Sequence, residues 1–192
     1  MPSNSTLEPP ALRPSDRRVR VVGNSGAGKT TFARALADRL EVAHLELDAV
    51  FWDAGWCKRD PEEARDLIRA FLSSPATATG WVADGNWDEP RAGLLDDADV
   101  LVWLDYPRSL VTSRVVRRSV ERVVLRRELW HGNRERARNL LSRDIHDNVV
   151  LYSWRAHDRV RSRYEALHDS GGTRVVRLRS PRQARSWLER SS

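Results

Sequence analysis

The stretch that decides the fold is GNSGAGKTTFARAL, residues 23–36, in which four residues separate Gly23 from Gly28, and Lys29 and Thr30 follow directly. A loop that wraps phosphate groups has to expose successive backbone N–H groups, and glycine permits the backbone angles and the close approach that this requires. The spacing therefore predicts a phosphate-binding loop, made of Gly23, Asn24, Ser25, Gly26, Ala27, Gly28, Lys29, Thr30 and Thr31.

Lys29 and Thr30 are the residue types that this chemistry needs. The chain has 33 basic residues, yet only Lys29 and Lys58 are lysines. A compact charge on a flexible stem suits the outer phosphates better than a planar arginine fork. The helix that begins here points the positive end of its dipole at a bound anion, and the Thr30 hydroxyl is placed to coordinate Mg²⁺. We therefore predict a catalytic role for Lys29 and a metal-binding role for Thr30.

The flanking sequence alternates strand and helix patterns. Residues 18–23 are typical of a strand and residues 29–40 of a helix, because Phe32, Ala33, Leu36, Ala37 and Leu40 recur at three- and four-residue spacing. A second helix is predicted over residues 59–72, with Asp60 as its N-cap and Pro61 in its first turn. Further strands are predicted at 42–48, 80–87, 99–105 and 173–179. Together these elements predict an α/β fold, with a five-stranded parallel sheet and helices on both faces.

Length and composition favour one domain. Of the 192 residues, residues 1–16 hold four prolines and are expected to form a disordered tail, with a single domain over 17–192. The single cysteine, Cys57, excludes an internal disulfide. No apolar run approaches the roughly 20 residues needed to cross a bilayer, so we expect a cytoplasmic protein without a membrane partner, as a monomer or homodimer. The net charge of +6 suits an acidic partner without choosing among nucleotides, nucleic acids and membrane surfaces.

Aspartates close the second, third and fourth predicted strands: Asp48, Asp84 and Asp105. Ligands of such sheets gather beyond the carboxyl ends of the strands. Asp84 suits a magnesium site beside the phosphates, and Asp48, farther out, suits a base for the phosphate acceptor. We interpret Asp105, which precedes Tyr106 and Pro107, as a structural turn or cap residue.

Several other side chains are candidates for contact with an acceptor. Aromatic rings beside a pocket can stack on a base or another ring, although the same rings can simply pack a mobile helix onto the sheet. Gly132 and Asn133 interrupt a helical pattern and predict a hinge in a closing lid. The candidates are Trp52, Trp56, Asn86, Trp87, Arg91, Asn133 and Arg134.

An arginine-rich helical stretch occupies about residues 109–150 and is predicted to form the lid. From Tyr106 to Arg138 it holds ten arginines against three glutamates. Four-residue spacing places Arg114, Arg118, Arg122 and Arg126 on one helical face, and we predict that Val116, Val120, Val123 and Val124 are buried on the opposite face. Guanidinium groups suit triphosphate recognition and the charge of a transition state. For most of these arginines a solvated charged face is the alternative.

Over about residues 18–192 the chain resembles the adenylate-kinase-like P-loop kinases. DYPRSLVTSRVVRR (105–118) is similar to the segment that enters their lid, which implies catalytic contacts of Arg114 and Arg118 with nucleotide phosphates. ADGNWDEPR (83–91) is similar to their segment with an aspartate near magnesium, here Asp84, but inserts residues before Arg91, the counterpart of an acceptor-phosphate contact. RLRSPRQARSWL (177–188) resembles their adenine-contacting loop and final helix, and the implied contacts are Ser180, Pro181 and Arg182.

A closer resemblance is to the bacterial group called DNA topology modulation or adenylate-kinase-related proteins, through HLELDAVFWDAGW (44–56) and VADGNW (82–87). These resemblances imply a three-layer P-loop NTPase fold that uses ATP and Mg²⁺. We expect phosphoryl transfer to a small-molecule acceptor, as in a nucleoside or nucleotide kinase. Two alternatives remain open: a nucleotide-binding protein that associates with nucleic acid, and a nucleotide switch without phosphoryl transfer.

Overall fold

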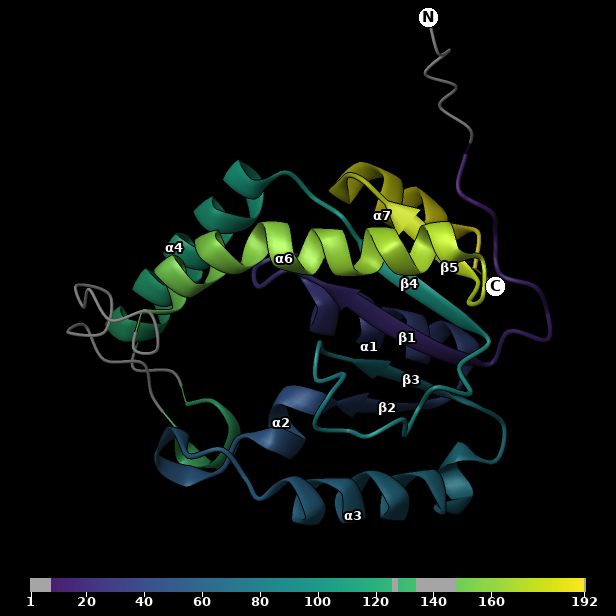
Figure 1. Cartoon of the computed structure of the whole chain (residues 1–192), viewed down its shortest axis with the longest axis horizontal. Coiled ribbons are helices and arrows are strands. Elements are labelled where there is room, and N and C mark those ends of the chain that lie inside the picture. The colour runs from purple at the N-terminus through teal and green to yellow at the C-terminus, as the bar shows by residue number, and fades with distance from the viewer. Residues whose placement is uncertain (1–7, 126–127, 134–147, 192) are drawn as a thin grey trace, which may run out of the picture.

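The computed structural model describes residues 8–125, 128–133 and 148–191 (Figure 1). Part of the predicted tail contacts the domain. The indole N–H of Trp187 donates to the Pro10 carbonyl at 2.8 Å, and the buried Asp16 pairs with Arg174. These contacts hold Pro10 and Asp16, both within the predicted tail, against the domain.

Five parallel strands form the sheet, in the order β2-β3-β1-β4-β5. This arrangement confirms the predicted α/β fold. The strands are β1 (Arg18–Gly23), β2 (Ala43–Glu46), β3 (Trp81–Asp84), β4 (Val100–Leu104) and β5 (Val175–Leu178). The prediction that β2 ends on Asp48 is wrong. Leu47 is fully buried as the first residue of a short helix, so the chain leaves the sheet after Glu46.

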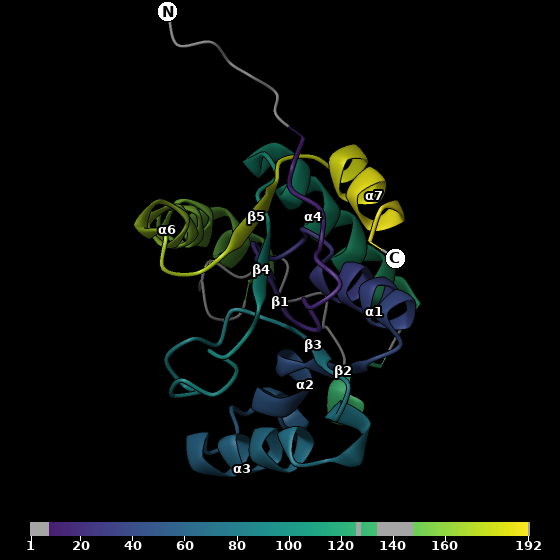
Figure 2. The ribbon, with the colours of Figure 1, turned by 90° about the vertical axis from the view of Figure 1, so that its right-hand side faces the viewer.

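Helices cover both faces of the sheet, as Figure 2 shows with the sheet between α6 and the pair α1 and α7. The α-helices are α1 (Lys29–Leu40), α2 (Leu47–Phe51), α3 (Pro61–Leu72), α4 (Arg108–Val124), α6 (Val149–Ser170) and α7 (Pro181–Glu189). The described residues also form the short 3₁₀ turns η1 (Ala54–Trp56), η2 (Pro75–Thr77) and η3 (Trp130–Gly132).

Alternating residues of β1 belong to different cores. Val19 and Val21 pack with α1, α7 and the start of α4 in one cluster, whereas Val22 packs with Trp103 and with Tyr164 of α6 on the opposite face. A third cluster joins α2 and α3 to Trp81 and Ala83 of β3, and to Leu95. The period of two in the strands thus fixes which helix covers which face.

Helix α3 begins as predicted, because the Asp60 carboxylate accepts from the N–H groups of Glu62 and Glu63, and Pro61 occupies the first helical position. The apolar side chains of α3 are only partly buried. Ala64 and Ile68 face the core, whereas Leu67 is 43% exposed.

The predicted orientation of α4 is wrong. The side chains that α4 buries are Val111, Val115 and Ser119, whereas Val116, Val120 and Val124 are 42%, 47% and 72% exposed. The buried stripe packs against the phosphate loop, since a Cβ added to Gly26 would meet the Val111 carbonyl and the Val115 side chain. Contacts with the loop and with α6, rather than the number of valines on a face, decide which face of α4 is buried.

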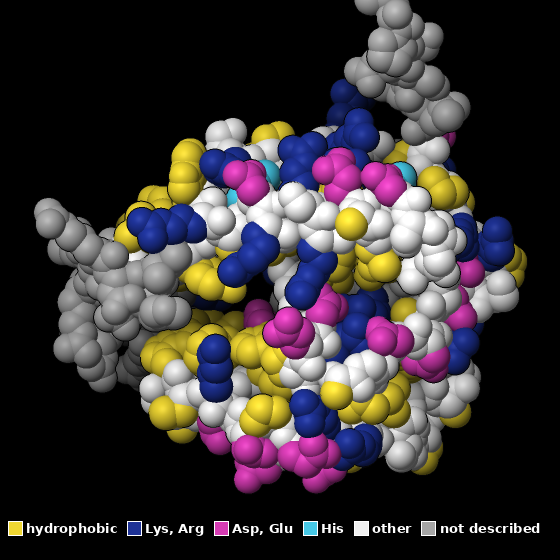
Figure 3. All heavy atoms as spheres, viewed as in Figure 1, with side chains coloured by type: hydrophobic (Ala, Val, Ile, Leu, Met, Phe, Trp, Pro, Cys, Tyr) yellow, Lys and Arg dark blue, Asp and Glu magenta, His cyan; other side chains and the backbone are white. Residues whose placement is uncertain are grey.

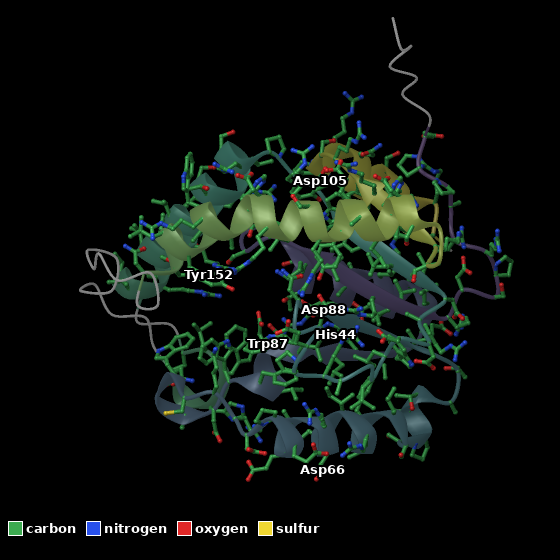
Figure 4. All side chains as sticks on the ribbon, viewed as in Figure 1. His44, Asp66, Trp87, Asp88, Asp105 and Tyr152 are labelled. Atoms are coloured by element: carbon green, nitrogen blue, oxygen red, sulfur yellow. The ribbon has the colours of Figure 1, made fainter. Side chains whose placement is uncertain are left out.

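Helix α6 follows Asn148, whose side chain caps it by accepting from the N–H groups of Val150 and Leu151. On α6, His157 and Tyr164 are buried, while Tyr152, near the start of the helix, is 47% exposed (Figure 4). In the described part of the chain, no helix has the length and apolar character to span a membrane.

Candidate functional site

The glycine-rich loop joins β1 to α1 at the carboxyl edge of the sheet, and its glycines serve different purposes. A Cβ at Gly23 would collide with the carbonyl of Leu104 in β4. Gly28, the N-cap of α1, has φ +91°, and a Cβ built on it would meet no atom within 4 Å. The left-handed backbone at position 28 therefore requires glycine, and the space into which a Cβ would point is open to a ligand.

Lys29 lies inside this loop. Its Nζ donates to the Asn24 carbonyl at 3.4 Å. Burial lowers the pKa of Lys29, and the charges of Asp48 and Asp84 oppose that shift. Both carboxylates are thus close enough to Lys29 to act on its charge, which brings three of the predicted site residues together.

Thr30 and Asp84 are in direct contact. The Thr30 hydroxyl donates to Asp84 Oδ2 at 2.7 Å and lies 3.3 Å from Glu46 Oε1. The buried Asp84 carboxylate also contacts His44 Nε2 at 2.9 Å. Sequence reasoning missed Glu46 and His44, which β2 brings to the site because the parallel register sets Glu46 beside Asp84.

These oxygen donors fit Mg²⁺, a cation that prefers oxygen ligands and keeps part of its shell for water and phosphate. In the residues that the structure describes, no group of three or more His, Cys, Asp and Glu side chains could enclose a metal ion on its own. The Thr30 hydroxyl and the Asp84 carboxylate can supply the protein's share of a site that nucleotide phosphates complete.

Asn86 fixes the first residue of the loop. Its Oδ1 accepts from the Gly23 N–H at 3.2 Å, and its Nδ2 donates to the Gly23 carbonyl at 2.7 Å. Oδ1 also accepts from the Tyr164 hydroxyl at 3.3 Å. Asn86 was a predicted contact for the acceptor. Its described contacts instead place it as a support for the loop.

Helix α6 supports the loop at a second point. The fully buried Ser153 donates its hydroxyl to the Ser25 carbonyl at 3.2 Å, and its own carbonyl accepts from Asn24 Nδ2 at 3.0 Å. No local pattern predicts this contact, because Ser153 stands 128 residues from Ser25.

Two arginines of α4 reach the loop. Arg118 Nη2 donates to Ser25 Oγ and Arg114 Nη1 to the Ala27 carbonyl, each at 3.4 Å. The Arg114 guanidinium also lies over the Tyr106 ring, 5.7 Å from its centroid. Burial raises the pKa of Tyr106 to about 12, although Arg114 opposes the shift. Both arginines therefore stand where they can contact phosphates held by the loop.

Asp48 lies in α2, where its carboxylate accepts from the Trp87 indole N–H at 2.7 Å. Figure 4 places Trp87 in the gap between α6 and the half of the molecule that contains α2 and α3. The space-filling view in Figure 3 shows a hollow between these two halves, with hydrophobic side chains along its lower border. Asp48 thus joins the phosphate loop to a partly aromatic surface.

Asn133 connects the predicted lid to η1. Its Oδ1 accepts from the Trp56 N–H at 2.9 Å, and its Nδ2 donates to the Asp53 carbonyl at 2.8 Å. Arg134, the other lid candidate, and Arg126 lie outside the described residues. The contacts of Asn133 place η3 beside the tryptophans rather than over the phosphate loop.

The side chain of Arg91 makes its contacts within its own segment, residues 88–96. Its buried guanidinium donates to the Leu94 carbonyl and pairs with Asp96 and Asp88. Asp88 is also paired with the buried Arg20 at 2.6 Å. The inserted residues before Arg91 accommodate this internal network, so we do not carry Arg91 into the acceptor site.

Ser180, Pro181 and Arg182 lie where β5 ends and α7 begins, at the same edge of the sheet as the phosphate loop. Ser180 caps α7 by accepting from the Gln183 N–H at 3.2 Å, and Arg182 is exposed. Their predicted contact with adenine stays a prediction. Asp105 is buried and paired with Arg177 at 2.7 Å.

Comparison with known proteins gives two distant relatives. No family model matches the chain. It is 28% identical over 110 residues to the uncharacterized protein YqaC of Bacillus subtilis and 29% identical over 143 residues to the cytidylate kinase of Halorubrum lacusprofundi. These alignments cover 55% and 67% of this chain, and 58% and 72% of the relatives. The chain thus spans little more than half the length of the first of them.

Two solved structures share the fold. An unliganded sugar kinase from Janibacter superposes with a TM-score of 0.52 at 19% identity, covering 91% of each chain. A shikimate kinase from Bacteroides thetaiotaomicron gives a TM-score of 0.50 at 15% identity, covering 90% of this chain and 94% of the other. The chain therefore has the fold of the small P-loop kinases and is distantly similar in sequence to one of them.

Proposed function

We propose that the protein transfers a phosphoryl group from ATP to a small-molecule acceptor of the nucleoside or nucleotide type. The observation that carries this proposal is the position of Asp48, which bonds to Trp87 and acts on the charge of Lys29 in the phosphate loop. A protein that only bound nucleotide would have no evident use for a carboxylate held between the loop and an aromatic surface.

The loop and its neighbours would hold Mg²⁺ and ATP. Loop N–H groups and Lys29 bind the phosphates, and Thr30 with Asp84 holds the cation. When bound, ATP supplies the phosphoryl group and Mg²⁺ neutralises part of its charge. Arg114 and Arg118, which already contact the loop, stabilise the charge that spreads over the transferred group.

Asp48 orients the acceptor and accepts its proton. The Trp87 indole N–H fixes one carboxylate oxygen at 2.7 Å, which leaves the other oxygen of the carboxylate for the acceptor hydroxyl. A base positioned in this way contributes typically 10²–10⁴-fold to a rate. This role explains why a carboxylate two residues beyond the end of β2 stands in the site.

An ADP-release assay over nucleosides, nucleotides, sugars and shikimate-like acids tests the proposal. We expect acceptor-dependent turnover that needs Mg²⁺ and falls at least about 100-fold in Lys29→Ala and in Asp48→Asn. Lys58→Ala is the matched lysine control, and Asp66→Asn, on the outer face of α3 (Figure 4), is the matched carboxylate control.

Three results would contradict the proposal. ATP affinity that does not change in Lys29→Ala would remove the role of the loop. Lys29-dependent ATP binding without turnover of any acceptor would favour a nucleotide switch. Affinity for duplex or single-stranded DNA that falls steeply with salt, again without acceptor turnover, would favour the nucleic-acid alternative.

A further inference from the structure

Four half-buried tryptophans form a continuous surface beside Asp48. This tryptophan cluster consists of Trp52, Trp56, Trp87 and Trp130. Its successive rings meet edge to face, with centroids 5.8 Å apart for Trp52 and Trp87, 6.0 Å for Trp52 and Trp56, and 6.4 Å for Trp56 and Trp130. Rings nearly perpendicular to one another form corners, and a flat group that enters a corner meets one ring with its face and the next with its edge.

Two sets of contacts hold the tryptophan cluster in place. Phe51 stacks on Trp87 at 4.6 Å with an interplanar angle of 13°, so it covers one face of that indole. Asn133 bonds to the backbone of Trp56 and of Asp53, and His131 contacts the Ala49 carbonyl at 3.0 Å. These bonds bring Trp130, on η3, next to Trp56, although the two residues are 74 positions apart in the sequence numbering. The aromatic surface is therefore built from three separate segments of the chain.

The charges around the cluster do not suit a phosphorylated acceptor. Arg91, the arginine that the resemblance assigns to an acceptor phosphate, is committed to Asp96, Asp88 and the Leu94 carbonyl. Arg59 lies beside the cluster, but its Nη2 is 3.8 Å from Asp53 and 3.4 Å from His131. Lys58 also lies here, because its backbone pairs with that of Trp52 in an isolated bridge. Among the described residues, the charges of Lys58 and Arg59 are thus matched by those of Asp48 and Asp53, so they bring no excess of positive charge to a phosphomonoester.

We propose that the acceptor is an uncharged alcohol with a flat heterocyclic ring, such as a nucleoside, and not a nucleoside monophosphate. This inference rests on the proposed function and names the acceptor class for the same site. The ring stacks on the tryptophan cluster and directs its hydroxyl to Asp48. The hydroxyl oxygen forms the new bond to the γ-phosphorus, the bond from that phosphorus to the bridging oxygen of ADP breaks, and the proton passes to the Asp48 carboxylate.

Matched pairs of probes test the acceptor class. Cytidine with CMP and adenosine with AMP differ only in the phosphate, and shikimate offers hydroxyls without an aromatic ring. Binding of each is measured by calorimetry on the full chain, with Mg²⁺ and a non-hydrolysable ATP analogue present. We expect at least one nucleoside to bind at least tenfold more tightly than its monophosphate, with shikimate binding more weakly than that nucleoside.

Trp52→Ala tests the stacking, with Trp154→Ala as the matched control because Trp154 is 47% exposed on α6 and contacts Arg108 instead. Removal of an aromatic ring that stacks on a base costs about 1–3 kcal/mol, which is about 5- to 150-fold in affinity. We expect this loss for the nucleoside in Trp52→Ala and no loss in Trp154→Ala. Binding of the Mg²⁺–ATP analogue should be unchanged in both variants, which also shows that they are folded.

The outcomes separate this inference from the proposed function. Equal or tighter binding of the monophosphates, binding of shikimate alone, or no saturable binding of either nucleoside overturns the inference, as does a nucleoside affinity that Trp52→Ala does not change. All these results leave ATP-dependent phosphoryl transfer intact as long as nucleotide binding depends on Lys29 and another acceptor is phosphorylated, but binding of shikimate alone would remove the nucleoside or nucleotide type of the acceptor. Loss of Lys29-dependent nucleotide binding would remove the proposed function itself.

Discussion

Asn86 bonds to both main-chain polar groups of Gly23, with its Oδ1 3.2 Å from the N–H and its Nδ2 2.7 Å from the carbonyl oxygen. Gly23 is the last residue of β1 and the first of the phosphate loop. One side chain on the segment after β3 therefore sets the direction in which the loop leaves the sheet.

Asn86→Ala should loosen the start of the loop. It leaves two main-chain groups without their partner, a change worth about 1–3 kcal/mol of unfolding free energy, and we expect nucleotide affinity to fall about tenfold. Denaturant unfolding and calorimetry measure the two effects. Asn86→Asp, which keeps the acceptor of the Gly23 N–H but not the donor to its carbonyl, should be intermediate, and unchanged amide exchange at Gly23 in the alanine variant would contradict this prediction.

Gly28→Ala and Gly171→Ala form a matched pair. Both glycines have left-handed backbones, with φ +91° and +68°, and neither has an atom within 4 Å of an added Cβ. Each substitution should cost about 1–2 kcal/mol of stability through backbone strain. Only Gly28→Ala adds a methyl group at the predicted phosphate site, so only this variant should lose nucleotide affinity, by at least tenfold. Equal nucleotide affinities of the two variants would show that the phosphates lie elsewhere.

The Thr30 hydroxyl should determine the magnesium requirement of nucleotide binding. Thr30→Val keeps the shape of the side chain and removes the oxygen that lies 2.7 Å from Asp84, whereas Thr30→Ser keeps that oxygen. We expect the valine variant to need about tenfold more Mg²⁺ for half-maximal ATP binding. The serine variant should resemble the wild type, and a titration in which valine and serine variants coincide would exclude Thr30 as a ligand.

Asp88 should contribute an acid-sensitive part of the stability. Burial raises the pKa of Asp88, but the charge and hydrogen bond of Arg20, together with the Tyr164 hydroxyl, outweigh burial and lower it overall. A carboxyl with a lowered folded pKa stabilises the protein above its unfolded pKa, near 3.9 for aspartate, and loses that contribution as pH falls through the folded value.

Asp88→Asn should therefore be less stable than the wild type near neutral pH, and the difference should shrink as pH falls below about 4. Urea unfolding over a pH series measures the difference. Asp66→Asn, whose side chain is 69% exposed, should follow the wild type throughout. A destabilisation by Asp88→Asn that stays constant down to pH 3 would show that the ion pair with Arg20 does not carry the effect.

The sheet could be predicted from the sequence because its signals are local. Strand β4 is a short apolar run, β1 alternates valine with arginine, and Gly23–Thr30 marks the turn into α1. Asp60 and Pro61 likewise define the start of α3 from side-chain chemistry alone. These features depend on neighbours a few residues away, which a sequence pattern contains.

Features that depend on distant segments could not be predicted in the same way. The register between β2 and β3 brings Glu46 to Asp84, and no spacing in the sequence records that register. The face of α4 that becomes buried depends on where the loop and α6 lie, so the exposed Val116 and Val120 were assigned to the core. Trp130 joins the aromatic surface because Asn133 ties η3 to η1 and His131 contacts the Ala49 carbonyl.

Helix α6 supports the phosphate loop at two points along its length. Ser153 donates directly to Ser25 of the loop, and Tyr164 donates to Asn86, which holds Gly23. A continuous helix cannot tilt at one of these points without moving at the other. Displacement of α6 would therefore disturb the contacts at Ser25 and at Asn86 together, so both supports of the loop depend on the position of one helix.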